Sequence, residues 1–371
     1  MIAAAAVMAG CSSGAKSSGE ATVDDYDFVL LDEAESVGER TILLSELIND
    51  FSVVKFEDTD SALFHSWKTV VSPDHVLIIQ GSQRPVKLFD HEGRYIANVG
   101  RTGQGPGEYM GVYDAAIDEK NGAIYLAQYN NAPVLEYNLK GEFVKAHDVK
   151  NLFKPVLYIN GDNSVSAASL SFSDIESPVS AATFTRGDTA YVTVAYPPLF
   201  SSFRNSEGNI ISMNNEIWAY KNTPNNAFMA TNNDTLYAYN AAENAIVPRA
   251  YLKMSSEKQP DNWFQGNELP GAIAIQVVGS GQRLMWYDKK TGELSQVTLV
   301  NDFLGNSTFN TNSLRCGYFV QVWEPGLLID RIEERWLKEN EMTDEQRQAL
   351  EKLRDSLDPE ANDVLLIGKL K

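Results

Sequence analysis

The sequence predicts an all-β chain: a six-bladed β-propeller with a short C-terminal helical insert before the last strand. Three observations support this fold class. Short apolar runs alternate with turn residues over most of the chain. A strand–turn–strand segment with its turn glycine at Gly93 is repeated 48 residues later, with the turn glycine at Gly141. Apolar residues at helical spacing are confined to about residues 327–358. Periods of about 40–50 residues with several strands each are typical of propeller blades.

The N-terminus has the features of an export signal followed by a lipid anchor. Residues 2–9 are small and apolar, and the junction Met8-Ala9-Gly10-Cys11 resembles the lipobox of bacterial lipoprotein signal peptides. That resemblance implies cleavage before Cys11 and attachment of a diacylglycerol to its thiol. No Lys or Arg precedes the apolar run, as in a signal peptide truncated at its start. We therefore expect a signal peptide over residues 1–10.

Residues 11–44 are expected to form a lipid-anchored flexible tether and lead-in, because Ser and Gly dominate residues 12–19. No later segment has the roughly 18 apolar residues needed to span a bilayer. The lipid anchor is therefore the only membrane contact predicted. The propeller itself is expected over residues 45–371.

The body of the chain reads as short strands. From about residue 50 to residue 300, apolar runs such as Val76–Ile79, Ile124–Leu126 and Leu236–Tyr239 are bounded by Gly, Asn and Asp. Such runs, rich in β-branched and aromatic residues, favour pleated sheet.

The internal repeat identifies the architecture. Residues 86–95 align with residues 134–143, and residues 286–294 resemble both. Each copy places Asp or Asn before a tight turn and Gly at its end, where Gly supplies a positive φ. Six blades fit the length; seven would require some short blades, and two stacked β-sandwiches would not explain the constant register.

The helical insert lies over about residues 327–358. Leu328, Ile332 and Trp336 recur at helical spacing, and Thr343 with Gln346 forms a capping-box signature for a second helix. The apolar last strand, residues 364–368, is too hydrophobic to be a free tail. We expect it to pair near residues 51–56 and close the ring.

Two segments resemble a known family. Residues 89–96 and the stretch Gly103-Gln104-Gly105-Pro106-Gly107-Glu108-Tyr109 resemble the six-bladed β-propeller lipoproteins of Bacteroidales, which look like relatives of NHL-repeat propellers. The likeness extends over about residues 45–371. It implies the fold and a location in the cell envelope, and it implies no activity.

Charge restricts the partners. The chain has 50 Asp and Glu against 31 Lys and Arg, a net charge of −19. Nucleic-acid binding needs clustered cations, so a nucleic-acid partner is not expected. The location expected from the anchor is the cell envelope, at the outer membrane, with its periplasmic or surface face undetermined.

The candidate ligand-binding residues are Glu108 and Tyr109, at the end of the glycine-rich loop, and Trp263, in a polar stretch expected to be a loop. Glu108 and Tyr109 either brace their loop or face a ligand. The glycine-rich loop lacks the Gly-Lys-Ser/Thr of a phosphate-binding loop, and no histidine pair has zinc spacing. We therefore predict no catalytic residue, no metal site and no cofactor.

The function predicted from the sequence is a non-catalytic binding module for a glycan, a peptide or an envelope protein. The alternative is a propeller hydrolase or lyase with a metal in the central channel. Several acidic or histidine side chains converging on the channel would favour the enzyme, and an aromatic-lined mouth would favour the binding module.

Overall fold

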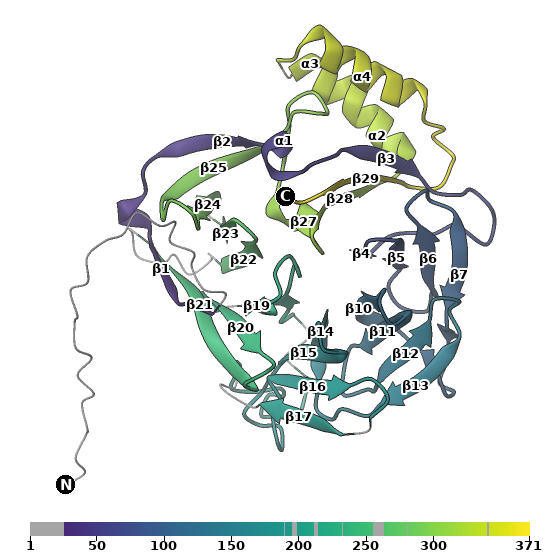
Figure 1. Cartoon of the computed structure of the whole chain (residues 1–371), viewed down its shortest axis with the longest axis vertical. Coiled ribbons are helices and arrows are strands. Elements are labelled where there is room, and N and C mark those ends of the chain that lie inside the picture. Colours follow the sequence, from purple (N-terminus) through teal and green to yellow (C-terminus); the bar gives the residue numbers. More distant parts are fainter. Residues whose placement is uncertain are drawn as a thin grey trace.

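The computed structural model is a closed ring of six sheets around a central channel (Figure 1). It describes residues 26–188, 190–194, 199–210, 214–231, 233–254, 263–279, 281–339 and 341–371. The expected signal peptide and Cys11 lie outside these residues. The six-bladed propeller predicted from the sequence is confirmed.

Each blade is built on four antiparallel strands, ordered from the channel outward and consecutive in the chain except in blade 6, and blades 1–6 are numbered here in chain order. Blade 1 contains β4 (Lys68–Val71), β5 (His75–Ile79), β6 (Val86–Asp90) and β7 (Tyr95–Val99). Blade 2 contains β10 (Val112–Asp118), β11 (Ala123–Gln128), β12 (Val134–Asn138) and β13 (Phe143–His147). Blade 3 contains β14 (Phe153–Ile159), β15 (Ser164–Leu170), β16 (Ala181–Thr185) and β17 (Tyr191–Val194).

The remaining blades carry additions. Blade 4 contains β18 (Ile217–Trp218), β19 (Ala227–Ala230), β20 (Thr235–Asn240) and β21 (Ala245–Lys253). Blade 5 contains β22 (Trp263–Leu269), β23 (Ala272–Val278), β24 (Arg283–Asp288), β25 (Leu294–Asn301) and β26 (Ser307–Phe309). Blade 6 contains β27 (Leu314–Arg315), β28 (Tyr318–Trp323), β29 (Val364–Lys369) and β3 (Ser52–Lys55). A small ribbon of β8 (Arg101–Thr102) and β9 (Glu108–Tyr109) lies between blades 1 and 2.

Blade 6 closes the ring with strands from both ends of the described chain. β29 is the third strand of this blade, and β3 pairs with it in antiparallel register, Val364 opposite Lys55 and Leu366 opposite Val53. The expected pairing of the last strand with residues 51–56 is confirmed. The blade cannot be completed by either end alone.

The repeated glycine is required by packing as well as by the turn. Gly93 has φ +81°, and a Cβ there would lie 2.3 Å from the carbonyl oxygen of Lys55, on the outer strand of blade 6. Gly141 repeats this arrangement one blade later, with φ +77° and a Cβ that would lie 2.1 Å from the carbonyl oxygen of Asn98. The turn of each blade therefore contacts the outer strand of the preceding blade. Any side chain at these positions would separate the two blades.

The part of the expected tether and lead-in that the structure describes, residues 26–44, packs on the ring. The lead-in contains β1 (Val29–Asp32), β2 (Glu39–Leu43) and α1 (Leu44–Leu47). β1 adds in parallel to the outer edge of blade 4, and β2 adds in parallel to the outer edge of blade 5. Leu31 and Ile42 are buried by this pairing. The physical reason is the open edge of each blade, which these strands cover.

The helical insert packs against the outside of the ring, near blade 6 (Figure 1). It consists of α2 (Pro325–Arg331), a π-helical turn (Ile332–Trp336), α3 (Leu337–Glu339) and α4 (Asp344–Asp355). Thr343 and Gln346 form the capping box of α4, as predicted. Leu328 and Leu350 are buried in one apolar cluster with residues of blades 5 and 6. Within the described part of the chain, no helix is long and apolar enough to cross a bilayer.

Candidate functional site

The inner strands of all six blades meet around a cavity of about 150 Å³ in the central channel. Its lining includes one residue from each of these strands: Lys68, Asp114, Val156, Trp218, Gln265 and Arg315. A second cavity of about 320 Å³ continues from it into the groove between blades 6 and 1, and the two share Lys68, Thr69 and Arg315. We call the two cavities together the channel mouth.

One carboxylate in the channel forms ion pairs with two lysines. The Oδ2 atom of Asp114 lies 2.5 Å from the Nζ of Lys221, and its Oδ1 lies 3.4 Å from the Nζ of Lys68. Asp114 also accepts from the backbone N–H of Leu157 at 2.8 Å. Burial would raise the pKa of Asp114, but Lys221 and Lys68 outweigh burial and hold this pKa below its ordinary value. Asp114 is therefore ionised, and both of its carboxylate oxygens already have partners within the protein.

Arg315 adds a third positive charge to this cavity. Its Nε donates to the carbonyl oxygen of Asn312 at 2.7 Å, and its Nη2 donates to the same oxygen. Among the described residues, no carboxylate lies within ion-pair distance of Arg315. The central cavity thus has three cations, Lys68, Lys221 and Arg315, against the single carboxylate of Asp114. This excess of positive charge occurs in a chain with a net charge of −19.

Unusual backbone geometry positions part of the channel wall. Lys221 has φ +58° and Cys316 has φ +55°, both in the left-handed region that non-glycine residues seldom adopt. The two are held by local contacts: the N–H of Cys316 donates to the carbonyl oxygen of Tyr220 at 2.7 Å, and the Nζ of Lys221 donates to the carbonyl oxygen of Ala115 at 2.8 Å. Such conformations cost about 1–3 kcal/mol each and are common at functional sites. Cys316 is the free cysteine of the described chain.

Aromatic side chains lie at the same mouth. Trp67, which precedes β4, is 47% exposed and lines the groove, with its ring 6.2 Å from that of Tyr113 and 6.3 Å from that of Tyr129. The Nζ of Lys68 lies 5.2 Å from the centre of the Trp67 ring. Tyr113 is buried, and its hydroxyl donates to Glu216 at 2.6 Å. Trp67 therefore offers an accessible indole face next to a cation.

Trp263 lies on a strand and not in the polar loop expected from the sequence. It is the first residue of β22, is half-buried, and stacks on Trp218 with ring centres 5.0 Å apart. Trp218 lines the channel cavity, so Trp263 is adjacent to the site through its stacking partner. The part of the expected loop at residues 259–262 lies outside the described residues.

Glu108 and Tyr109 brace the glycine-rich loop. The hydroxyl of Tyr109 donates to the carbonyl oxygen of Val99 at 2.6 Å and accepts from the N–H of Val86 at 2.8 Å. Burial raises the pKa of Tyr109 to about 12, so its hydroxyl stays protonated. Glu108 accepts from the N–H of Gly105 at 2.8 Å and pairs with Arg101, and these contacts lower its pKa. Both residues lie between blades 1 and 2, away from Trp263 in blade 5.

The donor set of the channel suits an anion better than a metal ion. Asp114 is paired with two lysines, and Glu216 lies 2.5 Å from the Nζ of Lys154. Within the described ranges, no three His, Cys, Asp or Glu side chains are arranged to hold a metal ion. Glu324, Asp363 and His65 line the adjoining groove, and they too are not arranged to hold a metal ion.

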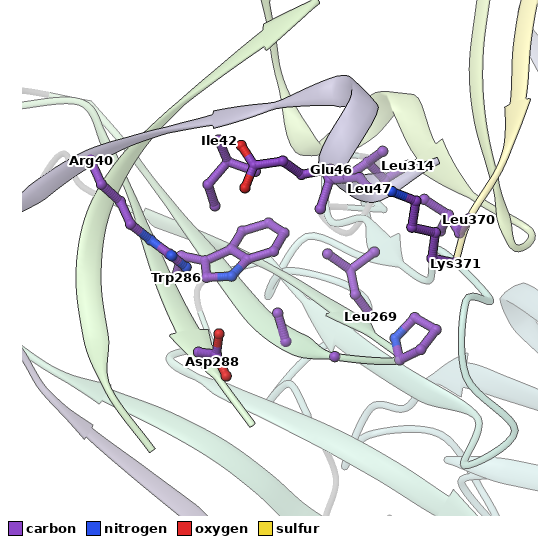
Figure 2. A pocket seen from close by; sticks show the side chains of 13 residues that line it. Arg40, Ile42, Glu46, Leu47, Leu269, Trp286, Asp288, Leu314, Leu370 and Lys371 are labelled. Carbon is purple, nitrogen blue, oxygen red and sulfur yellow. The ribbon is translucent and has the colours of Figure 1, made fainter. Parts of the chain in front are cut away.

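A separate cavity of about 250 Å³ lies between blades 5 and 6, against the lead-in (Figure 2). Ile42, Leu269, Trp286 and Leu314 form its apolar lining, and Arg40 lies at its edge. Its carboxylates have structural roles: Glu46 accepts from the N–H of Leu43, and Asp288 caps the turn after β24. This cavity was not predicted from the sequence, because the lead-in that covers it was not expected to pack on the ring.

A solved structure has the same architecture. A protein named as exported, from Bacteroides fragilis, is 15% identical to this chain, with a TM-score of 0.58 over 93% of this chain and 100% of its own. A member of the DUF4221 family from Bacteroides vulgatus is 10% identical, with a TM-score of 0.44 over 88% of this chain and 98% of its own. At these identities the likeness of the first structure shows the fold alone. No curated protein matches the chain.

The family model described as "Domain of unknown function (DUF4934)" matches residues 28–369. The match begins just before β1 and ends at the last residue of β29, so it includes the two lead-in strands as well as the ring. The chain belongs to the DUF4934 family.

Proposed function

We propose that the protein is a non-catalytic binding module of the cell envelope, anchored through a lipid on Cys11, whose ligand occupies the channel mouth. The lipobox-like junction before Cys11 supports the anchor. The exported Bacteroides protein with the same fold supports a location outside the cytoplasm. The ligand expected from the sequence is a glycan, a peptide or a segment of another envelope protein.

The observation that carries this proposal is the combination of fixed polar groups and an accessible aromatic face at the channel mouth. Lys221 and Arg315 are held by Asp114 and by Asn312, and Trp67 is half-exposed in the groove that it shares with Lys68 and Arg315. Rigid aromatic and cationic anchors are characteristic of binding sites. In the central cavity a hydrolase would need a free general base or metal-binding carboxylates, whereas Asp114 and the nearby Glu216 are both ion-paired with lysines.

Array binding with two matched variants tests this proposal. Saccharide and peptide arrays are probed with the wild type, with Trp67→Ala and with Tyr191→Ala, a control on the outer strand of blade 3 that is 39% exposed. Wild type and Tyr191→Ala should bind the same ligand. Trp67→Ala should bind it about 5–150-fold more weakly, the effect of losing an aromatic anchor worth about 1–3 kcal/mol.

Two results would count against this assignment. Unchanged binding by Trp67→Ala would move the site away from the channel mouth, with the cavity of Figure 2 as the next location to test. Turnover of a bound saccharide that stops on chelation would support the alternative, a metal-dependent hydrolase or lyase.

A further inference from the structure

We propose that the ligand of the channel mouth is an acidic saccharide, with its carboxylate bound by Arg315 and Lys68 and its ring lying on Trp67. This inference rests on the proposed function, because it names the class of ligand that the same site binds.

The first step concerns charge at the central cavity. Its lining holds three cations and one carboxylate, and that carboxylate is shared between Lys68 and Lys221. Arg315 has a backbone carbonyl as its partner and keeps its full positive charge available. An anionic group of the ligand would supply the negative charge that the protein does not provide, and a guanidinium suits a carboxylate because its donors form a planar fork.

The second step concerns repulsion among the cations. Burial lowers the pKa of Lys68, and the positive charges of Lys221 and Arg315 lower it further, although Asp114 acts in the opposite direction. Lys221 and Arg315 are therefore close enough to disfavour the charged form of Lys68. A bound carboxylate would relieve this repulsion and raise the pKa of Lys68 again.

The third step distinguishes a sugar from an acidic peptide. Trp67 is accessible and lies in the same groove as Arg315, so a ring that stacks on the indole can direct an attached carboxylate toward the guanidinium. Neutral donors and acceptors suited to hydroxyl groups, Thr69, Gln265 and Asn312, line the central cavity. An acidic side chain would pair with the cations but leave the Trp67 face unused.

The groove also contains carboxylates, and their position determines which end of the channel mouth can bind the carboxylate of the ligand. Glu324 and Asp363 line it together with His65. Burial raises the pKa of Asp363 to about 6, while His65 lowers it and Glu324 raises it. The carboxylates of Glu324 and Asp363 make this end of the groove unfavourable for the carboxylate of a ligand. The carboxylate of the ligand is therefore directed to the channel side, where Lys68, Lys221 and Arg315 lie.

Titration calorimetry with three defined probes tests the inference: trigalacturonic acid, a neutral galactose trisaccharide and a triglutamate peptide. Arg315→Gln removes the free cation, and Lys150→Gln is the control because Lys150 is an exposed lysine paired with Asp148. The wild type should bind trigalacturonic acid about tenfold or more tightly than the neutral trisaccharide. Arg315→Gln should lose about tenfold in affinity for the acid and little for the neutral sugar. Lys150→Gln should bind as the wild type does, and thermal melts confirm that each variant is folded.

The outcomes separate this inference from the proposed function. Equal affinity for the acidic and neutral sugars, with both lost in Trp67→Ala, would overturn the acidic class and leave the binding site in place. Tighter binding of triglutamate than of trigalacturonic acid would overturn the saccharide class. Binding of trigalacturonic acid that is unchanged in both Arg315→Gln and Trp67→Ala would overturn the site together with the proposed function.

Discussion

Closure of the ring by β29 makes a quantitative prediction about stability. Deleting residues 363–371 removes the strand between β28 and β3 and leaves two unpaired edges in blade 6. Its four apolar side chains, residues 364–367, are almost completely buried. At about 1.5–3 kcal/mol for each buried side chain, the deletion removes on the order of 6–12 kcal/mol. That equals most or all of the roughly 5–15 kcal/mol by which domains are stable. We therefore expect the truncated protein to lose cooperative unfolding.

Urea denaturation followed by near-ultraviolet circular dichroism measures this effect. A graded variant accompanies the deletion: Leu366→Ala should keep the fold and lose about 2–5 kcal/mol, with an unchanged dependence on urea concentration. Leu63→Ala, at a residue that is 47% exposed, is the control and should change stability by less than about 0.5 kcal/mol. A truncated protein that unfolds in the same cooperative transition as the wild type would refute the closure mechanism.

Three further predictions concern single residues. Because burial raises the pKa of Asp363 to about 6, folding favours its protonated form; stability should fall as pH rises from about 4 to about 6 and stay lower above. Asp363→Asn should therefore gain about 1–3 kcal/mol relative to wild type at about pH 7.5 and little at about pH 4.5; an equal change at both pH values in urea denaturation would contradict this. Arg249 is completely buried and lies 2.8 Å from Glu268, so Glu268→Gln leaves this guanidinium without a carboxylate. The free energy of unfolding, measured by thermal unfolding, should fall by about 3–5 kcal/mol, and a fall below about 1 kcal/mol would show that the pair is dispensable. Trp263→Ala removes the stack on Trp218 and should cost about 1–2 kcal/mol in stability while weakening ligand binding; a loss of about 3–5 kcal/mol would identify it as a core residue instead.

The blades were predictable because each one carries its own local signal. The Asp-to-Gly turn at Gly93 and its copy at Gly141 mark equivalent positions of two blades, and each turn packs on the outer strand of the preceding blade without room for a side chain at the glycine. Closure was predictable because residues 364–367 are apolar throughout, as a strand with two neighbours requires. The lead-in strands were not predicted, since each is short and obtains its stability from the blade edge it covers.

The channel mouth could not be predicted in the same way. Lys68, Asp114 and Arg315 come from different blades, and no local motif connects residues so distant in sequence. Only the ring brings them together. Glu108 and Tyr109 follow a glycine-rich loop, and a polar and an aromatic residue in that place have the same sequence pattern whether they brace the loop or bind a ligand. Their hydrogen bonds within the loop became evident only in three dimensions.

The lead-in strands have a consequence for how the chain reaches its native state. Asp32 of β1 contacts Lys253, 221 residues away, and Glu39 of β2 contacts Gln296, 257 residues away. During synthesis from the N-terminus, these early segments therefore wait without partners until blades 4 and 5 have been made. Contacts this distant in sequence slow folding, and an uncovered blade edge is a template for pairing with another chain. Docking of β1 and β2 therefore covers the outer edges of blades 4 and 5, and a lead-in that docks slowly would prolong the time for which those edges are open to aggregation.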